Sequence, residues 1–132
     1  MKQTTIKKAV SISGVGLHTG QNVTLTFLPA VDNHGIKFQR VDLPGQPIVD
    51  ADVDNVVDTS RGTTIEQHGA RIATVEHVMA SLAGLEIDNC LVQIDATETP
   101  IMDGSSKFFV EAIEKAEIVE QSAERVYYVV KE

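Results

Sequence analysis

The sequence predicts an α+β fold, a two-layer sandwich in which one mainly antiparallel sheet carries two helices on one face. Two observations predict this class. Strand-like alternation of apolar and polar residues fills much of the first half of the chain, whereas helical periodicity is confined to residues 75–83 and 106–116. Strands and helices therefore do not alternate regularly, which disfavours a parallel βαβ sheet. With 132 residues, 42% of them hydrophobic, the chain is long enough for a single domain with one core.

The first elements are predicted to be half-buried strands. One strand is predicted from Thr5 to Ser13, and it ends in the glycine-rich loop from Gly14 to Gly20. Alternation over 23–28 and over 36–39 predicts two further strands. The residues between them, 31–35, include Asp, Asn and Gly, which are typical of turns. We therefore expect these two strands to form a hairpin.

The middle of the chain has a different composition. The segment 41–59 holds two prolines, a glycine and several aspartates, which predicts a path over the surface. Short strands are predicted at 63–66 and near Arg71, followed after the first helix by an apolar strand from Asn89 to Asp95. Cys90 lies in that apolar strand, and we expect it to be a small buried core residue.

Both helices have predicted starts and ends. Thr74 is expected to cap the first helix and Gly84 to stop it. Ser105 or Ser106 is expected to cap the second helix, and Asp103 in the preceding turn is interpreted as a local capping acid. One face of the second helix is predicted to be buried, and its residues are Phe109, Ala112, Ile113 and Ala116.

Residues 126–130 have the apolar, β-branched and aromatic composition of a strand. They are either a terminal strand of this sheet or the lead-in to a second domain. The predicted division is thus a domain over 1–125 and a terminal segment over 126–132.

Charge and composition exclude several classes of function. Eleven Lys and Arg residues stand against 19 Asp and Glu, for a formal net charge of −8, and no basic cluster with interleaved aromatics is present, which disfavours nucleic acid as a partner. No secretory h-region or membrane-length apolar run occurs, which predicts a cytoplasmic protein. Cys90 is the only cysteine, so an intrachain disulfide and a cysteine zinc ribbon are excluded.

Glu76 and His77 are the first candidates for chemistry, because they are adjacent at the predicted start of a helix. Adjacent helical side chains point about 100° apart, but both can border a site beyond the helix end. The helix dipole favours an ionised carboxylate and a neutral imidazole there, which is the form of histidine that binds metal. Such a pair can serve a metal-activated water. On spacing alone the signal is weak, because Glu-His pairs on helices are common and usually face solvent.

The other histidines give weaker signals. His34 and His68 each precede a glycine in a turn-like setting, so a solvated turn is the expected role of both. His18 lies in the glycine-rich loop and is the better site candidate, although a structural hydrogen bond is as compatible with its position. The glycine spacing of that loop differs from a dinucleotide-binding fingerprint.

Four motifs together resemble the UDP-3-O-acyl-N-acetylglucosamine deacetylases, the LpxC family of lipid A biosynthesis, in the family's order and separations. They are Ser13-Gly-Val-Gly-Leu-His-Thr-Gly20, Thr74-Val-Glu-His77, Gly84-Leu-Glu-Ile-Asp-Asn89 and Pro100-Ile-Met-Asp-Gly-Ser105. The resemblance covers essentially the whole chain and only the first half of that family's enzyme. It implies a ribosomal S5 domain 2-like fold, with an insert at about 41–62 that borders the substrate site. It is compatible with the form of the enzyme that is fused to a 3-hydroxyacyl-carrier-protein dehydratase.

The resemblance also implies roles for individual residues. Glu76 corresponds to the general base and His77 to one ligand of a catalytic Zn²⁺. The remaining ligands, a histidine and an aspartate, belong to a second domain, which makes that domain a partner of this one. Ser60, Arg61 and Gly62 of the insert are assigned to binding UDP-3-O-acyl-N-acetylglucosamine, and we assign His18 to the same substrate site.

Three hypotheses follow. The first is the N-terminal part of a zinc-dependent deacetylase that lacks turnover as an isolated chain. The second is a non-catalytic binding or assembly module that uses the exposed helix face. The third is a self-contained metal site that combines His18 with His77.

Overall fold

The structure, a computed structural model, describes residues 1–125. This part of the chain forms ten strands, two α-helices and one short 3₁₀-helix. The strands are β1 (Lys2–Ile6), β2 (Val10–Val15), β3 (Asn22–Pro29), β4 (Ile36–Arg40), β5 (Ile48–Asp50), β6 (Val56–Asp58), β7 (Thr64–Gln67), β8 (Ala70–Ile72), β9 (Cys90–Ile94) and β10 (Ile118–Glu124). The helices are η1 (Val53–Asn55), α1 (Glu76–Gly84) and α2 (Lys107–Lys115). The strand predicted over 126–130 lies outside the described residues.

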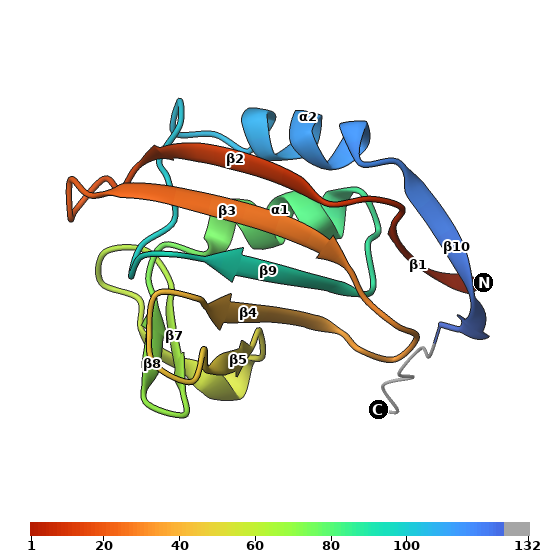
Figure 1. Ribbon diagram of the computed structural model, residues 1–132, viewed down its shortest axis with the longest axis horizontal. Coiled ribbons are helices and arrows are strands. Elements are labelled where there is room, and N and C mark those ends of the chain that lie inside the picture. The colour runs from red at the N-terminus through yellow and green to blue at the C-terminus, as the bar shows by residue number, and fades with distance from the viewer. Residues whose placement is uncertain (126–132) are drawn as a thin grey trace, which may run out of the picture.

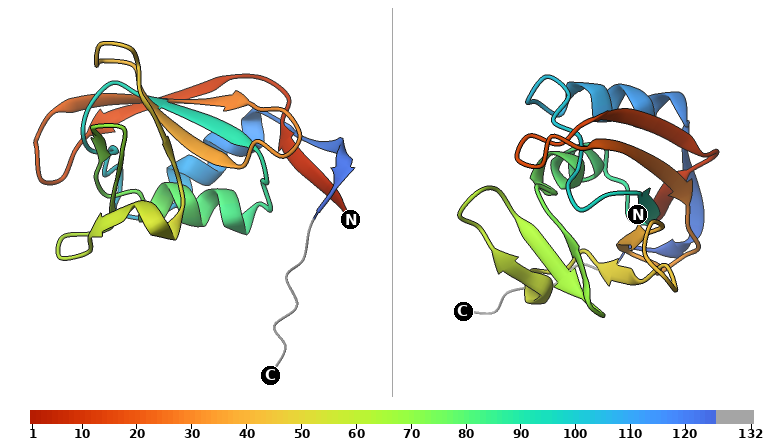
Figure 2. Two further views of the ribbon diagram at one scale, coloured as in Figure 1. Left: turned by 90° about the horizontal axis from the view of Figure 1, so that it is seen from below. Right: turned by 60° about the vertical axis from the view of Figure 1, so that its left-hand side comes forward.

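The α+β two-layer class is confirmed. The main sheet has five strands in the order β2-β3-β9-β4-β5, and both helices cover the same face of it (Figures 1 and 2). All neighbours in this sheet are antiparallel except β4 and β9, which are parallel. β9 is the third of the five strands and therefore lies at the centre of the sheet. This position agrees with the complete burial of its inward-facing residues Cys90, Val92 and Ile94.

The predicted hairpin between β3 and β4 is wrong. Both strands exist, and the connection between them has the expected turn chemistry, with Asn33 at φ 64° and Gly35 at φ 74°. The strands do not pair with each other, however, because β9 lies between them. A single apolar strand from later in the chain gains two hydrogen-bonded neighbours by entering this position, and local turn residues carry no information about that insertion.

The predicted single strand from Thr5 to Ser13 is also wrong, because the chain changes sheet within it. β1 pairs with β10 in a two-stranded sheet, whereas β2 joins the main sheet. The break falls at Lys7, whose amide donates to the carbonyls of Ala116 and Glu117 at the end of α2. Strand β10 was not predicted from the sequence, since its alternation is formed largely by polar residues.

The segment 41–59 is only partly a surface path. β5 lies within it and forms the edge of the main sheet, with Val49 fully buried. β6 joins β7 and β8 in a separate three-stranded sheet. The prediction of a purely external excursion missed β5 because the flanking prolines, glycine and aspartates mask a strand of only three residues.

One hydrophobic core joins the sheet to the helices. The predicted buried face of α2 is confirmed, because Phe109, Ala112, Ile113 and Ala116 are all 8% exposed or less. The burial of Cys90 is confirmed as well, and desolvation raises the pKa of its thiol to about 12. Such a thiol is protonated and unreactive at neutral pH.

No helix in the described part of the chain is long and apolar enough to cross a membrane.

The helix ends differ from the predicted caps. The cap position of α1 is Val75, not Thr74, and no side chain caps this helix. At the other end Gly84 is the last helical residue, and the left-handed residue is Glu86, at φ 57°. Short polar residues do not cap a helix when tertiary contacts take their hydroxyls, and the Thr74 hydroxyl donates to Glu98 instead.

The turn before α2 is held by Asp103, as expected for a local acid. Its Oδ1 accepts hydrogen bonds from the amide (3.0 Å) and the hydroxyl (2.7 Å) of Ser105. The Ser105 hydroxyl in turn accepts from the amide of Lys107 at 3.3 Å. Ser106 occupies the cap position without a capping side-chain bond. Of the two predicted serines, Ser105 therefore binds the helix start.

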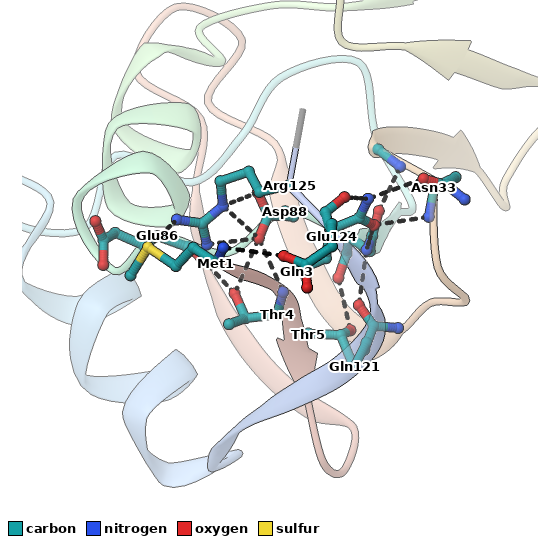
Figure 3. A network of polar contacts seen from close by, with 12 residues as sticks. Met1, Gln3, Thr4, Thr5, Asn33, Glu86, Asp88, Gln121, Glu124 and Arg125 are labelled. Carbon is teal, nitrogen blue, oxygen red and sulfur yellow. Dashed lines mark hydrogen bonds and ion pairs between the residues drawn. The ribbon is translucent and has the colours of Figure 1, made fainter. Parts of the chain in front are cut away.

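A polar network holds β1 and β10 to the end of the main sheet (Figure 3). Asn89 lies at its centre and is 1% exposed. Its amide nitrogen donates to the side chains of Gln3 (2.9 Å) and Gln121 (2.7 Å), and its oxygen accepts from the Gly35 amide at 2.8 Å. Because every polar group of this side chain is satisfied, its burial does not incur the penalty of an unpaired amide.

Asp88 at the edge of this network gives a prediction on pH. Burial raises its pKa, but hydrogen bonds from Arg125 and from the Thr4 amide outweigh burial and hold the pKa below the ordinary 3.8. A depressed folded-state pKa stabilises the fold at pH values above the ordinary pKa of the group. This stabilisation is lost as the pH falls from the ordinary pKa through the folded-state pKa. We expect Asp88→Asn to cost about 1–3 kcal/mol at pH 7 and less at low pH. Urea unfolding between pH 7 and 3 measures this, and parallel stability curves for the two proteins would contradict it.

Candidate active site

The start of α1 places Glu76 and His77 at the first two helical positions. The Oε1 atom of Glu76 accepts a hydrogen bond from the Thr63 amide at 2.9 Å. The carbonyl of the same Thr63 accepts from the amide of Val75 at 3.1 Å. Two hydrogen bonds of Thr63 thus attach the loop after β6 to the start of α1. One of them holds the Glu76 carboxylate through its Oε1 atom.

Gly62 lies directly against this carboxylate. It has φ +90°, and a Cβ placed on it would lie 2.7 Å from Oε2 and 3.3 Å from Oε1 of Glu76. Any larger residue would therefore meet both a strained backbone and the carboxylate. Glycine permits the backbone to approach this side chain closely. The predicted site residues Gly62 and Glu76 are thus brought together.

His77 is half-buried, and the described residues make no hydrogen bond to its ring. Its backbone carbonyl accepts from the hydroxyl of Ser81 at 2.7 Å and from that of Ser106 at 3.4 Å. These bonds tie the first turn of α1 to the start of α2. The backbone at His77 is therefore fixed, while its imidazole keeps both nitrogens available.

Glu98, in the loop between β9 and α2, is the site residue that sequence reasoning missed. It is 1% exposed, and its Oε1 accepts from the amides of His18 (2.9 Å) and Thr19 (3.0 Å). Its Oε2 accepts from the hydroxyl of Thr74 at 2.9 Å. Burial raises the pKa of this carboxyl, but these three hydrogen bonds and the charge of His18 outweigh burial and lower it below the ordinary 4.5. A lone glutamate between two threonines carries no sequence signal of such a role.

The other predicted site residues are His18, Ser60 and Arg61. The His18 side chain is exposed, but its backbone is joined through Glu98 to Thr74. Ser60 is exposed, and its amide and hydroxyl both donate to Asp58 at 2.8 Å. Arg61 is exposed beside Gly62. Their assignments to substrate binding stay predictions.

His34 and His68 lie in turns, as expected. His68 is exposed and adopts φ 54° between β7 and β8. His34 is half-buried, with its Nδ1 atom 2.8 Å from the carbonyl oxygen of Gly35. Neither belongs to the groups around the start of α1 described above.

The donor set at the start of α1 is compatible with zinc but incomplete. His77 offers an imidazole nitrogen, and a half-buried carboxylate is its neighbour; both are ligand types that zinc accepts. Within residues 1–125 no three histidine, cysteine, aspartate or glutamate side chains gather closely enough to hold a metal ion. The zinc site and its ligand His77 therefore stay predictions.

Comparison with known proteins decides the family. The family model described as UDP-3-O-acyl N-acetylglycosamine deacetylase matches residues 3–132, nearly the whole chain. The chain belongs to the LpxC family. This agrees with the resemblance carried by the four motifs, two of which, the glycine-rich loop and the start of α1, meet at Glu98 in the structure.

Relatives within the LpxC family are similar over the full length of this chain. It is 52% identical over 99% of its length to a bifunctional enzyme LpxC/FabZ of Bacteroides thetaiotaomicron, and covers 28% of that protein. It is 48% identical, again over 99% of its length, to the UDP-3-O-acyl-N-acetylglucosamine deacetylase of Methylococcus capsulatus, of which it covers 43%. The chain thus spans between about a quarter and under half of the length of these relatives.

Gly62 supplies a test of the geometry in this LpxC-family chain. We expect Gly62→Ala to lower the protection of the Thr63 amide against hydrogen exchange by about 10-fold or more, because the new methyl group displaces the Glu76 carboxylate that accepts from this amide. Positive φ alone should also cost about 1 kcal/mol or more of stability. Amide hydrogen exchange and urea unfolding measure the two effects.

Gly69→Ala is the matched control for that substitution. Gly69 also has positive φ, +76°, but a Cβ there would meet no atom within 4 Å. It should therefore show a similar strain cost with the protection of the Thr63 amide unchanged. Equal protection of this amide in the two variants would show that position 62 does not contact Glu76.

Proposed function

We propose that this chain forms the first part of a zinc-dependent deacetylase of lipid A biosynthesis. The enzyme hydrolyses the acetamide of UDP-3-O-acyl-N-acetylglucosamine in the cytoplasm. The observation that supports this most directly is the arrangement at the start of α1 in an LpxC-family chain. There the carboxylate of Glu76 is anchored by the Thr63 amide through one oxygen, beside a histidine whose backbone is fixed.

The proposed work of Glu76 is to take a proton. Its Oε1 is occupied by the Thr63 amide, and in the described residues no donor binds its Oε2. Oε2 is therefore the atom that receives the proton of the attacking water, while the water oxygen bonds to the acetamide carbon. Cleavage of the C–N bond then gives acetate and the free amine, which takes up a proton as it leaves.

His77 is the residue of this chain that would hold the metal. When bound, zinc polarises the acetamide carbonyl and lowers the pKa of the attacking water. Neutral imidazole is the form of histidine that binds metal. The other ligands and the acid that protonates the leaving amine are expected from the part of the relatives' length that this chain does not cover.

The test compares two proteins. One is the product of the complete reading frame, and the other is the 132-residue chain alone, each assayed for acetate release from UDP-3-O-acyl-N-acetylglucosamine with added Zn²⁺. We expect turnover and about one zinc per molecule only in the first. Absence of turnover in both would contradict the proposed function, and robust turnover by the chain alone would contradict the incomplete site.

A further inference from the structure

We propose that Glu98 is a positioning residue that joins the glycine-rich loop of 14–20 to the start of α1 and thereby sets the orientation of Glu76 and His77. This inference rests on the proposed function for its effect on catalysis. The contact itself is a property of the fold, and it links three segments that are distant in sequence. Glu98 is separated by 79 residues from Thr19 and by 24 from Thr74.

The carboxylate is enclosed and fully used by the protein. Its two oxygens accept three hydrogen bonds, two from backbone amides and one from a hydroxyl. Only 1% of the residue is exposed. A buried carboxylate without such donors would be strongly destabilising, whereas three donors keep this one ionised. Because both oxygens are bound by the protein and the side chain is buried away from substrate, the role of Glu98 is to position other groups and not to react.

The loop is shaped to receive this side chain. A Cβ on Gly16 would lie 2.5 Å from Oε1 of Glu98 and 2.6 Å from the hydroxyl oxygen of Thr19. The loop closes on itself through the bond from the Gly20 amide to the Gly16 carbonyl at 3.0 Å. Glycine at position 16 therefore leaves the space that the carboxylate of Glu98 occupies.

On the other side, Glu98 and its neighbour Thr99 hold Thr74 through its hydroxyl and its carbonyl. The Thr74 hydroxyl donates to Glu98, and its carbonyl accepts from the hydroxyl of Thr99. Thr74 adopts φ 62°, which is unfavourable for a β-branched residue and persists only where surrounding contacts impose it. This residue sets the direction in which the chain enters α1, two positions before Glu76. Loss of the Glu98 contact should therefore change the orientation of Glu76 and His77.

The experiment uses the protein from the complete reading frame with three substitutions. Glu98→Ala removes all three bonds. Glu98→Gln keeps the connectivity, because its oxygen can accept from both amides while its NH₂ donates to the Thr74 hydroxyl. Thr74→Ala removes only the bond to Oε2 and serves where Glu98→Ala does not fold. Asp88→Asn is the matched control, since Asp88 also accepts from a backbone amide and a side chain, at the far end of the sheet.

We expect Glu98→Ala to lower kcat by about 10- to 100-fold with a smaller change in KM. Thr74→Ala should have a weaker effect in the same direction, and Glu98→Gln should restore kcat to within about threefold of the original. Asp88→Asn should lower stability with kcat unchanged. Unaltered kcat in both Glu98→Ala and Thr74→Ala, or equal losses in Glu98→Gln and Glu98→Ala, would overturn the proposal.

A second readout is independent of turnover. Amide hydrogen exchange should show His18 and Thr19 protected in the original protein and unprotected in Glu98→Ala. The NMR signals of the Thr63 amide, which reports on Glu76, and of the His77 ring should shift in Glu98→Ala and stay in place in Asp88→Asn. If the original protein has no deacetylase activity, the proposed function fails while these signals still decide the positioning role. Unshifted Thr63 and His77 signals in Glu98→Ala would refute it.

Discussion

In the protein made from the complete reading frame, Glu76→Gln should lower kcat for the proposed deacetylation by about 10²–10⁴-fold while zinc content stays the same, which is the usual effect of removing a positioned general base. Glutamine is nearly the same size, and its oxygen can still accept from the Thr63 amide that now binds Oε1 at 2.9 Å. The loop at Gly62 and Thr63 therefore stays in place. The substitution removes the basic Oε2 atom, so it lowers kcat without affecting folding.

Two further measurements make this test specific. Glu66→Gln is the control, because Glu66 pairs with Arg71 on the exposed hairpin of β7 and β8, and it should leave kcat unchanged. Metal analysis of Glu76→Gln separates a base from a ligand. Zinc lost from this variant would show that Glu76 holds the metal, and kcat within a few-fold of the original would show that it is not the base.

The local features of this fold could be predicted from the sequence because they depend on neighbouring residues. The buried face of α2 follows from helical spacing alone, and Phe109 and Ile113 lie in the core as that spacing requires. The burial of Cys90 follows from its apolar strand. The turn at Asp103 follows from its short acidic side chain two residues before Ser105.

The errors arise where distant segments compete for the same neighbours. β3 and β4 have the alternation and the turn of a hairpin, yet β9 separates them, and no local pattern shows which strand will occupy the centre of a sheet. Thr74 has the composition of a cap, but its hydroxyl binds Glu98, 24 residues later. Both outcomes were decided by tertiary contacts that outweigh local preference.

The candidate site divides in the same way. Glu76 and His77 could be found because they are adjacent in a motif, and Gly62 because it belongs to the resembling insert. Glu98 could not be found, since its three donors come from two segments that meet only in the folded chain. The sequence thus indicates the groups expected to react, while the groups that orient them become visible through burial and hydrogen bonding.

His77→Asn should remove zinc from the protein made from the complete reading frame. A catalytic zinc site has three protein ligands, and loss of an outer partner alone costs roughly 10–100-fold in affinity. Loss of a direct ligand should therefore weaken binding by more than about 100-fold. The fold should persist, because the bonds from Ser81 and Ser106 reach the backbone carbonyl of residue 77 and not its ring.

Zinc titration against a competing chelator measures this effect, with His68→Asn as the control. His68 lies in an exposed turn at φ 54°, a conformation that asparagine tolerates well, so zinc affinity should not change there. A further comparison tests the alternative metal site that combines His77 with His18. If that alternative holds, the 132-residue chain alone binds zinc, and His18→Asn weakens zinc binding as much as His77→Asn does. Zinc affinity that survives His77→Asn would refute the ligand assignment, whatever the effect of Glu76→Gln on kcat.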